Sequence, residues 1–314
     1  MLAEEVRSGL VETVHDGAVA VVDASGELIA SYGEIDRPFY FRSSAKPFQA
    51  AVSQACGAVL AREQLAVACA SHDGQPVHVA LVESILGGAG LTVDDLRNPP
   101  AWPLSASSQR RLAASGHTSP SRLWHNCSGK HAAMLAASVA SGWDPSTYLD
   151  PRHPLQARIT DTIRDVAGPV EPIGVDGCGA PVFATTARGM GRAFARLSVG
   201  DEFLEVFDAM HAFPALVSGY YNIDAAIATH LDAVAKRGAA GAIGIGLRGR
   251  LGIAVKVWGG SGLVAGVAGL AALDQVGALT PLARERLRLH SHPVVKGGGQ
   301  EVGRFQPRLE LRWQ

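Results

Sequence analysis

The sequence predicts a mixed α/β fold whose sheet is built from both ends of the chain, with a mostly helical lobe inserted between them. Strand-like segments occur near the N-terminus, in "GAVAVVDASGELIASYG", and again late, in "GAIGIGLRGRLGIAVKVWGG". The middle is dominated by alanine-rich helical patterns. This order suits an α/β lobe of approximately 1–50 plus 235–314 and a helical lobe of approximately 51–234, forming one catalytic unit over 1–314.

Composition limits the class of protein. Hydrophobic residues make up 47% and charged residues 18% of the 314 residues, which is an ordinary balance for a folded chain with a sizeable core. The net charge of -1 argues against broad binding to nucleic acids or anionic membranes, which need a basic surface. No secretory signal or membrane span is recognised, so a cytoplasmic location is expected. Four cysteines are too few for a disulfide scaffold.

The elements are predicted in chain order from turns, periodicity and prolines. The first two strands flank the turn sequence Asp23-Ala24-Ser25-Gly26 and form a hairpin. A helix follows, with its N-cap at about Ser44, because Pro47 is tolerated only in a first turn. The clearest later helices are Leu60–Ala68, Val77–Leu86 and His131–Ala140. Near the end, two strands and a glycine turn precede a last apolar helix.

Ser43 and Lys46 lie together at the start of the first predicted helix, in "RSSAKPFQA". The positive end of a helix dipole favours a developing alkoxide and disfavours a protonated amine, and burial acts on the amine in the same direction. A serine beside a neutral amine is an activated nucleophile. The alternative is that the serine only caps the helix, since Ser-x-x-Lys also occurs by chance.

Ser71 lies in "ASHDGQP", where an apolar segment breaks into a polar loop before the next helix. Loops of this kind present polar groups at clefts in many enzymes, so Ser71 or His72 could face a substrate. Alternatively, Ser71 and Asp73 merely cap the following helix. Lys256 is the single polar residue in the apolar strand "LGIAVKV". It either reaches solvent from an edge or points into a cleft as a second amine.

Two cysteines have surroundings that suit a reactive or metal-binding thiol. Cys127 precedes an apolar helix in "HNCSGKH", where a helix N-terminus favours the thiolate, and Cys178 lies between glycines in "DGCGAP". Two thiolates can begin a zinc site, with His125, Lys130 and His131 as local candidates for further ligands. The alternatives are two free buried thiols or a Cys127–Cys178 disulfide. Cys56 and Cys69 are predicted to be core thiols.

Taken together, these segments resemble the bacterial asparaginase II family, the group of the Rhizobium type II L-asparaginase. The resemblance covers most of the chain, and five short motifs occur in the family's order. It implies a serine-lysine amidohydrolase, an L-asparaginase, with a fold similar to serine β-lactamases and glutaminases. It also implies a homodimer and a small-molecule substrate, L-asparagine.

The resemblance assigns roles residue by residue. Ser43 with Lys46 and Ser71 with Lys256 match two catalytic Ser-Lys tandems. A zinc ion (Zn2+) that shapes the pocket rather than attacks is implied, with Cys127, Lys130 and Cys178 as the matching ligands and water completing the shell. The residues that match the lining of the substrate pocket are Arg42, His131 and Asp176.

The chain departs from the family pattern at two positions. Gln75 stands where glutamate is common, and Asn222 stands where an arginine is expected before an aspartate. The first departure removes one partner of a supporting ion pair, and the second bears on the choice between asparagine and a related amide. Two other hypotheses remain. One is a β-lactamase or penicillin-binding enzyme, although Lys256-Val257-Trp258 differs from the Lys-Thr-Gly of those enzymes. The other is a non-catalytic amide sensor or zinc-storage protein.

Overall fold

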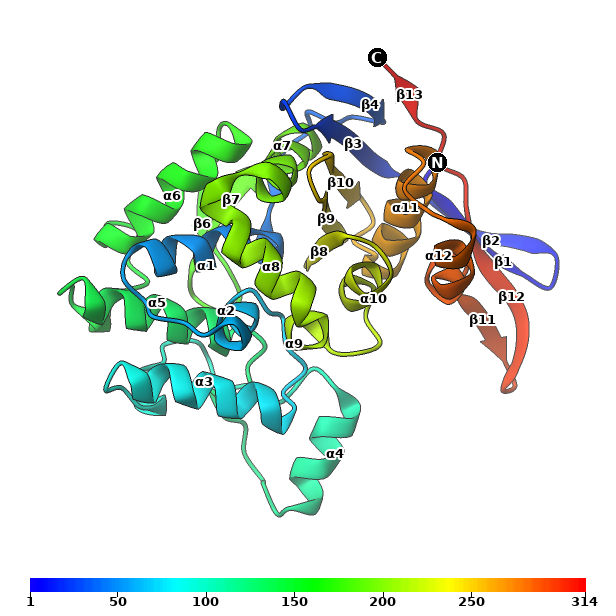
Figure 1. The fold of residues 1–314 in the computed structure, drawn as a ribbon. Coiled ribbons are helices and arrows are strands. Elements are labelled where there is room, and N and C mark those ends of the chain that lie inside the picture. Colours follow the sequence, from blue (N-terminus) through cyan, green and yellow to red (C-terminus); the bar gives the residue numbers. More distant parts are fainter.

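The computed structural model describes all residues from 1 to 314 and confirms the mixed α/β fold (Figure 1). The strands are β1 (Ala3–Arg7), β2 (Leu10–His15), β3 (Gly17–Asp23), β4 (Leu28–Tyr32), β5 (Phe39–Tyr40), β6 (Ile173–Val175), β7 (Pro181–Thr185), β8 (Ala233–Gly238), β9 (Ala242–Leu247), β10 (Leu251–Val257), β11 (Val294–Gly297), β12 (Gln300–Pro307) and β13 (Arg312–Trp313).

The helices occupy mainly the middle of the chain. They are α1 (Lys46–Ala55), α2 (Arg62–Ala68), α3 (Pro76–Gly88), α4 (Ala106–Ala114), α5 (Ser128–Ala140), α6 (Pro154–Ala167), α7 (Ala187–Val199), α8 (Leu204–Ala212), α9 (Pro214–Ser218), α10 (Ile223–His230), α11 (Gly262–Gln275), α12 (Pro281–Arg286) and α13 (Arg288–Ser291). The predicted hairpin, the three clearest helices and the late strand-strand-helix order are all confirmed. No helix has both the length and the apolar character needed to span a bilayer.

The main sheet combines strands from both ends of the chain, as the sequence predicted. Its strand order is β13-β4-β3-β10-β9-β8, and every neighbouring pair is antiparallel. The central strands β3 and β10 are almost entirely buried, which explains their continuous apolar sequences rather than an alternating pattern. Helices α7 and α11 both pack against the sheet.

Glycines in the strands allow α7 to approach the sheet closely. A Cβ atom at Gly252 would lie 2.2 Å from the backbone nitrogen of Ala195, and one at Gly244 would lie 2.0 Å from the Phe194 ring. Both contacts are far shorter than van der Waals distance, so only glycine fits. Helix α7 lies within the stretch 51–234 that was expected to form the helical lobe, yet it covers the sheet because these glycines make room for it.

The start of α1 differs from the prediction. Residues Arg42–Ala45 form a short 3-10 helix, η1, and α1 begins at Lys46 with Pro47 in its first turn. Ser44 does not cap α1: its hydroxyl donates a hydrogen bond of 3.0 Å to the backbone oxygen of Lys236 on β8. A buried polar group needs a partner, and here the partner comes from the sheet rather than from the helix. Ser44 therefore ties η1 to the edge strand.

Candidate active site

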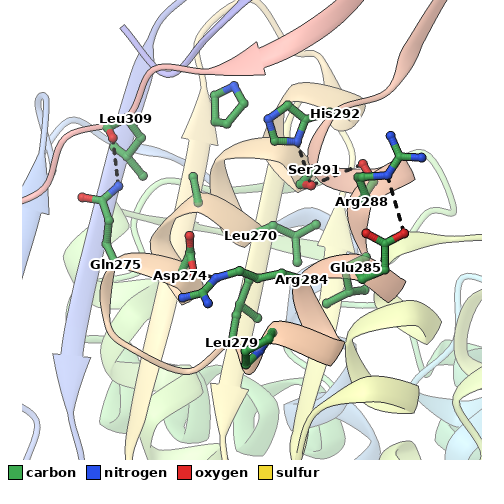
Figure 2. Close-up of a pocket in the computed structure, with 14 residues that line it drawn as sticks. Leu270, Asp274, Gln275, Leu279, Arg284, Glu285, Arg288, Ser291, His292 and Leu309 are labelled. Atoms are coloured by element: carbon green, nitrogen blue, oxygen red, sulfur yellow. Dashed lines mark hydrogen bonds and ion pairs between the residues drawn. The ribbon is translucent and has the colours of Figure 1, made fainter.

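One cavity near the C-terminal part of the chain lacks catalytic character. It lies among α11, α12, α13 and the C-terminal strands, and has a volume of about 440 Å³ (Figure 2). Its polar groups are already paired with one another: Arg284 with Asp274 at 2.6 Å, and Gln275 with the backbone oxygen of Leu309 at 2.8 Å. It contains no lysine. Nothing in this cavity combines a hydroxyl with an amine.

A second cavity, of about 570 Å³, contains both serines that the sequence analysis singled out. Ser43 enters from η1 and Ser71 from the loop between α2 and α3. The other polar residues that line it are Asp73, Ser105, Asn126, Ser218, Asn222, Lys236 and Arg237. Segments that are far apart in the sequence thus meet here, and we refer to this space as the serine cavity.

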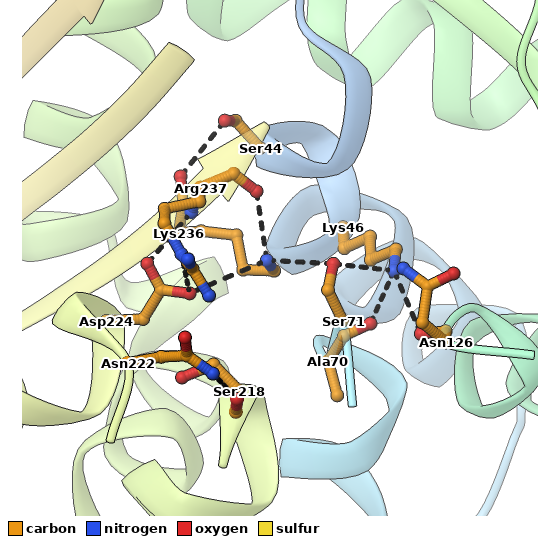
Figure 3. A network of polar contacts seen from close by, with 10 residues as sticks. All are labelled: Ser44, Lys46, Ala70, Ser71, Asn126, Ser218, Asn222, Asp224, Lys236 and Arg237. Carbon is orange, nitrogen blue, oxygen red and sulfur yellow. Dashed lines mark hydrogen bonds and ion pairs between the residues drawn. The ribbon is translucent and has the colours of Figure 1, made fainter. Parts of the chain in front are cut away.

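The hydroxyl of Ser71 is shared by two lysine amines (Figure 3). Nζ of Lys46, from α1, lies 3.0 Å from Oγ of Ser71, and Nζ of Lys236, from β8, lies 3.0 Å from the same oxygen. Lys46 also donates to the backbone oxygens of Ala70 and Asn126. A serine hydroxyl can accept from one amine while donating to the other only if the second amine is neutral. The three side chains form one continuous hydrogen-bonded chain, Lys46–Ser71–Lys236, which could act as a proton relay.

The environment of Lys236 favours its neutral form. Its side chain is fully buried, and burial lowers the pKa of Lys236 to about 7, further helped by the nearby charges of Lys46 and Arg237. The carboxylate of Asp224, 4.0 Å from Nζ, acts in the opposite direction and raises this pKa, so the value stays near neutrality. An amine with such a pKa can accept a proton and return it at physiological pH.

Ser43 lies beside this relay but outside its hydrogen bonds. Its hydroxyl forms no hydrogen bond with Lys46, although the two residues belong to the same Ser-x-x-Lys motif, and it faces the serine cavity. The preceding residue, Arg42, has a φ angle of +53°, a left-handed conformation that costs energy for any residue except glycine. The surrounding structure keeps the backbone of Arg42 in this strained conformation, which directs the chain into η1.

The amine next to Ser71 is Lys236, not Lys256. Lys256, on β10, donates to the backbone oxygen of Ala240 and lies 5.6 Å from the centre of the Phe39 ring; it does not line the serine cavity. Lys236 also follows apolar strand residues, in "AVAKRG", but Arg237 comes directly after it, so the local pattern is weaker than that of Lys256. The order of strands in the sheet decides which of the two faces α1, and local sequence does not contain that order.

Arg42, Asp176 and His131 lie outside the lining of the serine cavity. Nε of Arg42 forms an ion pair of 2.7 Å with Asp176. His131 is fully buried, and its Nδ1 lies 2.6 Å from the hydroxyl of Tyr148. Burial lowers the pKa of His131 to about 4, so this imidazole is neutral. Their predicted contact with substrate stays a prediction.

Cys127 and Cys178 pack together in one small buried cluster, as the sequence analysis expected of a shared site. All four cysteines are free, which excludes the Cys127–Cys178 disulfide. A hydrogen bond with Cys178 lowers the pKa of the Cys127 thiol well below its ordinary value, with further help from Lys46 and Lys130. For Lys130, burial acts to lower the pKa, but the two thiols and Asp176 outweigh it and raise the pKa. The charge of Lys130 thus favours the thiolate form of Cys127.

The donor atoms of this cluster fit a thiophilic metal ion. No group of three or more His, Cys, Asp or Glu side chains is placed to hold a metal, so two thiolates would need the amine of Lys130, or water, to complete a tetrahedral shell. A second observation agrees with an absent ligand: Nε2 of His131 is buried without a hydrogen-bond partner. Zinc binding would require Lys130 to lose its proton.

The two departures from the family pattern have local compensations. Nε2 of Gln75 donates to Oδ2 of Asp73 at 2.9 Å, and the other oxygen of Asp73 lies 3.2 Å from Nδ1 of His78. A carboxylate is thus present beside His78 although position 75 is not acidic. Asn222 donates to the backbone oxygen of Ser218 and lines the serine cavity. The cavity therefore has a short amide side chain at position 222, where the family pattern has an arginine.

A family model described as L-asparaginase II matches residues 3–307. The chain belongs to the L-asparaginase II family. Membership of the L-asparaginase II family makes this chain an amidohydrolase of the asparaginase type. No curated protein matched it.

Several solved structures are similar, though only distantly. Mglu in its native form is 16% identical, with 94% of this chain and 70% of that chain covered and a TM-score of 0.48. The probable glutaminase ybaS is 15% identical, with 81% and 83% covered and a TM-score of 0.43. A Bacillus glutaminase is 11% identical, with 83% and 91% covered and a TM-score of 0.39.

We predict that Lys236 and Lys256 differ in their effect on amide hydrolysis. Lys236→Met should lower the rate of ammonia release by about 10² to 10⁴-fold, the usual range for losing a general acid-base group. Lys256→Met should have a much smaller effect, because its amine bonds a backbone oxygen away from Ser71. Steady-state ammonia assays on both variants measure this. A larger loss for Lys256→Met than for Lys236→Met contradicts the assignment.

The pKa of Lys236 predicts how activity depends on pH. The folded pKa of about 7 lies below the ordinary 10.5, so the amine is neutral above about pH 7 and protonated below it. kcat/KM should therefore rise with pH through this region. Asp224→Asn removes the carboxylate that raises the pKa, while Lys46, Arg237 and Cys127 stay in place, so the rise should move to lower pH. Profiles of both proteins test this, and a move to higher pH contradicts it.

Proposed function

We propose that the protein is an L-asparaginase that hydrolyses L-asparagine to L-aspartate and ammonia through an acyl-enzyme on serine. The observation that carries the proposal is the serine cavity, where Ser43 and Ser71 lie with two buried lysine amines hydrogen-bonded to Ser71. In a member of the L-asparaginase II family, an amide is the natural electrophile for such a group. A purely binding function gives no reason to bury two amines against one hydroxyl.

Ser43 is proposed as the nucleophile because its hydroxyl faces the cavity and bonds neither lysine. Its Oγ attacks the side-chain amide carbon of asparagine, and its proton passes through Ser71 to the neutral amine of Lys236. The same relay returns the proton to the departing nitrogen, which leaves as ammonia. A water molecule then attacks the ester, with its proton taken by the relay, and aspartate is released as Ser43 regains its hydrogen.

The opposite assignment of the two serines has one supporting contact. Ser71 is the hydroxyl that bonds both amines, which would activate it directly for attack. In that case Ser43 would only orient the substrate. The site of the covalent intermediate distinguishes the two assignments, since only the nucleophile carries the aspartyl group.

A zinc ion is proposed at Cys127, Cys178 and Lys130, with water completing the shell. Bound there, it would supply a fixed positive charge and hold the chain between β6 and β7 against the start of α5. Lys46 connects this cluster to the relay, because its charge lowers the pKa of Cys127 while its amine bonds Ser71. The family resemblance assigns Arg42, His131 and Asp176 to the substrate pocket, and a homodimer remains the predicted assembly.

A serine enzyme acting on β-lactams is the second candidate, and one observation favours it. The strand at the cavity carries Lys236-Arg237-Gly238, which differs at one position from the Lys-Thr-Gly found on the corresponding strand of β-lactamases and penicillin-binding proteins. Lys256-Val257-Trp258, which also differs from Lys-Thr-Gly, lies at the end of β10 and outside the serine cavity. Hydrolysis of the chromogenic β-lactam nitrocefin tests this candidate directly.

Replacing Ser43 with alanine should lower ammonia release from L-asparagine by at least about 10³-fold, since covalent catalysis is lost while the cavity remains. Ser71→Ala should slow the reaction less, because only the relay is interrupted. Ser108→Ala, a buried serine on α4 outside the cavity, is the matched control. Acid-quenched enzyme and peptide mass spectrometry locate the aspartyl ester. An ester on Ser71, or turnover retained in Ser43→Ala, would falsify the assignment of the nucleophile.

The zinc proposal predicts one bound metal ion per chain that depends on the thiols. Cys127→Ser should lose the metal, whereas Cys56→Ser should keep it, because Cys56 is a core thiol whose pKa is raised by burial. Elemental analysis of purified protein measures the stoichiometry, and cobalt substitution gives sulfur-to-metal charge-transfer bands as an independent signal. Equal metal content in both variants, or none in the native protein after zinc addition, rejects the site.

A further inference from the structure

Arg237 is a charged residue in the serine cavity that no catalytic step uses. It follows Lys236 on β8, and its side chain is 32% exposed. Its Nε lies 3.2 Å from Oδ2 of Asp224, and its backbone nitrogen donates to Oδ1 of the same carboxylate at 3.1 Å. The two terminal nitrogens of the guanidinium donate to no group in the protein. This free edge matches the geometry of a carboxylate.

Asp224 holds the guanidinium in one orientation. The residue lies in the first turn of α10 and is only 2% exposed, so its carboxylate is a fixed, buried partner (Figure 3). Because Nε is engaged, the side chain of Arg237 loses little further freedom when a ligand binds at its other edge. Preorganisation of this kind increases affinity by reducing the entropy lost on binding.

Asp73 offers the opposite charge in the same cavity. Its Oδ2 accepts a hydrogen bond from Nε2 of Gln75 at 2.9 Å. Its Oδ1 is buried 3.2 Å from Nδ1 of His78, whereas the side chain as a whole is 16% exposed, so Oδ2 is the oxygen that faces the cavity. An ionised carboxylate can accept several hydrogen bonds, so Asp73 keeps capacity for an ammonium group.

The charges of the serine cavity therefore suit a zwitterion. Its charged residues are Asp73, Lys236 and Arg237, and Lys236 is engaged with Ser71. Arg42 and Asp176, which the resemblance assigns to the substrate, instead neutralise each other at 2.7 Å and do not line the cavity. An α-amino acid amide needs one anion and one cation besides the catalytic groups, and these two positions provide them.

We propose that Arg237 binds the α-carboxylate and Asp73 the α-ammonium group of the amino acid amide. This inference rests on the proposed function for the identity of the substrate, and it assigns the two residues that select an α-amino acid over a simple amide. Asp224 acts through Arg237 and is a positioning residue.

Binding of product analogues by isothermal titration calorimetry tests the proposal without turnover. L-aspartate has both α-groups, β-alanine lacks only the α-carboxylate, and succinate lacks only the ammonium group. Arg237→Gln should weaken L-aspartate binding by about 10- to 100-fold, the effect of losing a charge-assisted contact, while leaving β-alanine unchanged. Asp73→Asn should weaken L-aspartate and leave succinate unchanged. Arg250→Gln, at an exposed turn, is the control.

Arg237→Gln leaves Asp224 buried without its partner, so the double variant Arg237→Gln/Asp224→Asn provides a second test. It should show the same selective loss, with thermal denaturation confirming that both proteins are folded. Equal weakening of L-aspartate and β-alanine overturns the proposal, as does a selective loss in Arg42→Gln instead, or failure of the native protein to bind L-aspartate. The predicted pattern in a protein that hydrolyses no amide would reject the proposed function and leave this inference standing.

Discussion

The structure of the site depends on one shared hydrogen-bond acceptor, the hydroxyl of Ser71, between the amines of Lys46 and Lys236. These amines come from α1 and β8, so the helix and the edge strand must be held in a fixed relation. Two contacts do this. Ser44 donates to the backbone oxygen of Lys236, and Gly238 lets η1 approach, since a Cβ atom there would lie 2.6 Å from the backbone oxygen of Phe41.

Burying two amines side by side costs free energy, because both lose their contacts with water. Each amine regains part of this free energy from different polar neighbours. Lys46 donates hydrogen bonds to the backbone oxygens of Ala70 and Asn126. Lys236 has one backbone oxygen, that of Arg237, and a carboxylate at 4.0 Å. The pKa of Lys236, lowered by burial to about 7, lets this amine exchange a proton near neutral pH. Phe48 supports the arrangement by packing its ring against Phe194 on α7.

The sequence was informative wherever local chemistry decides the outcome. Pro47 placed the first turn of α1, the Asp23–Gly26 turn placed the hairpin, and the two thiols were correctly expected to meet. Prediction was limited where long-range pairing decides. Lys256 and Lys236 both follow apolar strand residues, but only β8 is the edge strand that faces α1. Ser44 looks like a helix cap, yet its partner is 192 residues away. Such contacts depend on strand order, which no short segment contains.

The interleaving of both chain ends in the main sheet also has a consequence for synthesis. Ser71 and Lys236 are 165 residues apart, and β3 finds its central neighbour only when β10 has been made. During synthesis, Ser43 and Ser71 are therefore made long before Lys236 has been translated. Until β10 has been made, the apolar hairpin of β3 and β4 has an unpaired edge at β3, and the contact between Ser71 and Lys236 cannot form before β8 has been made.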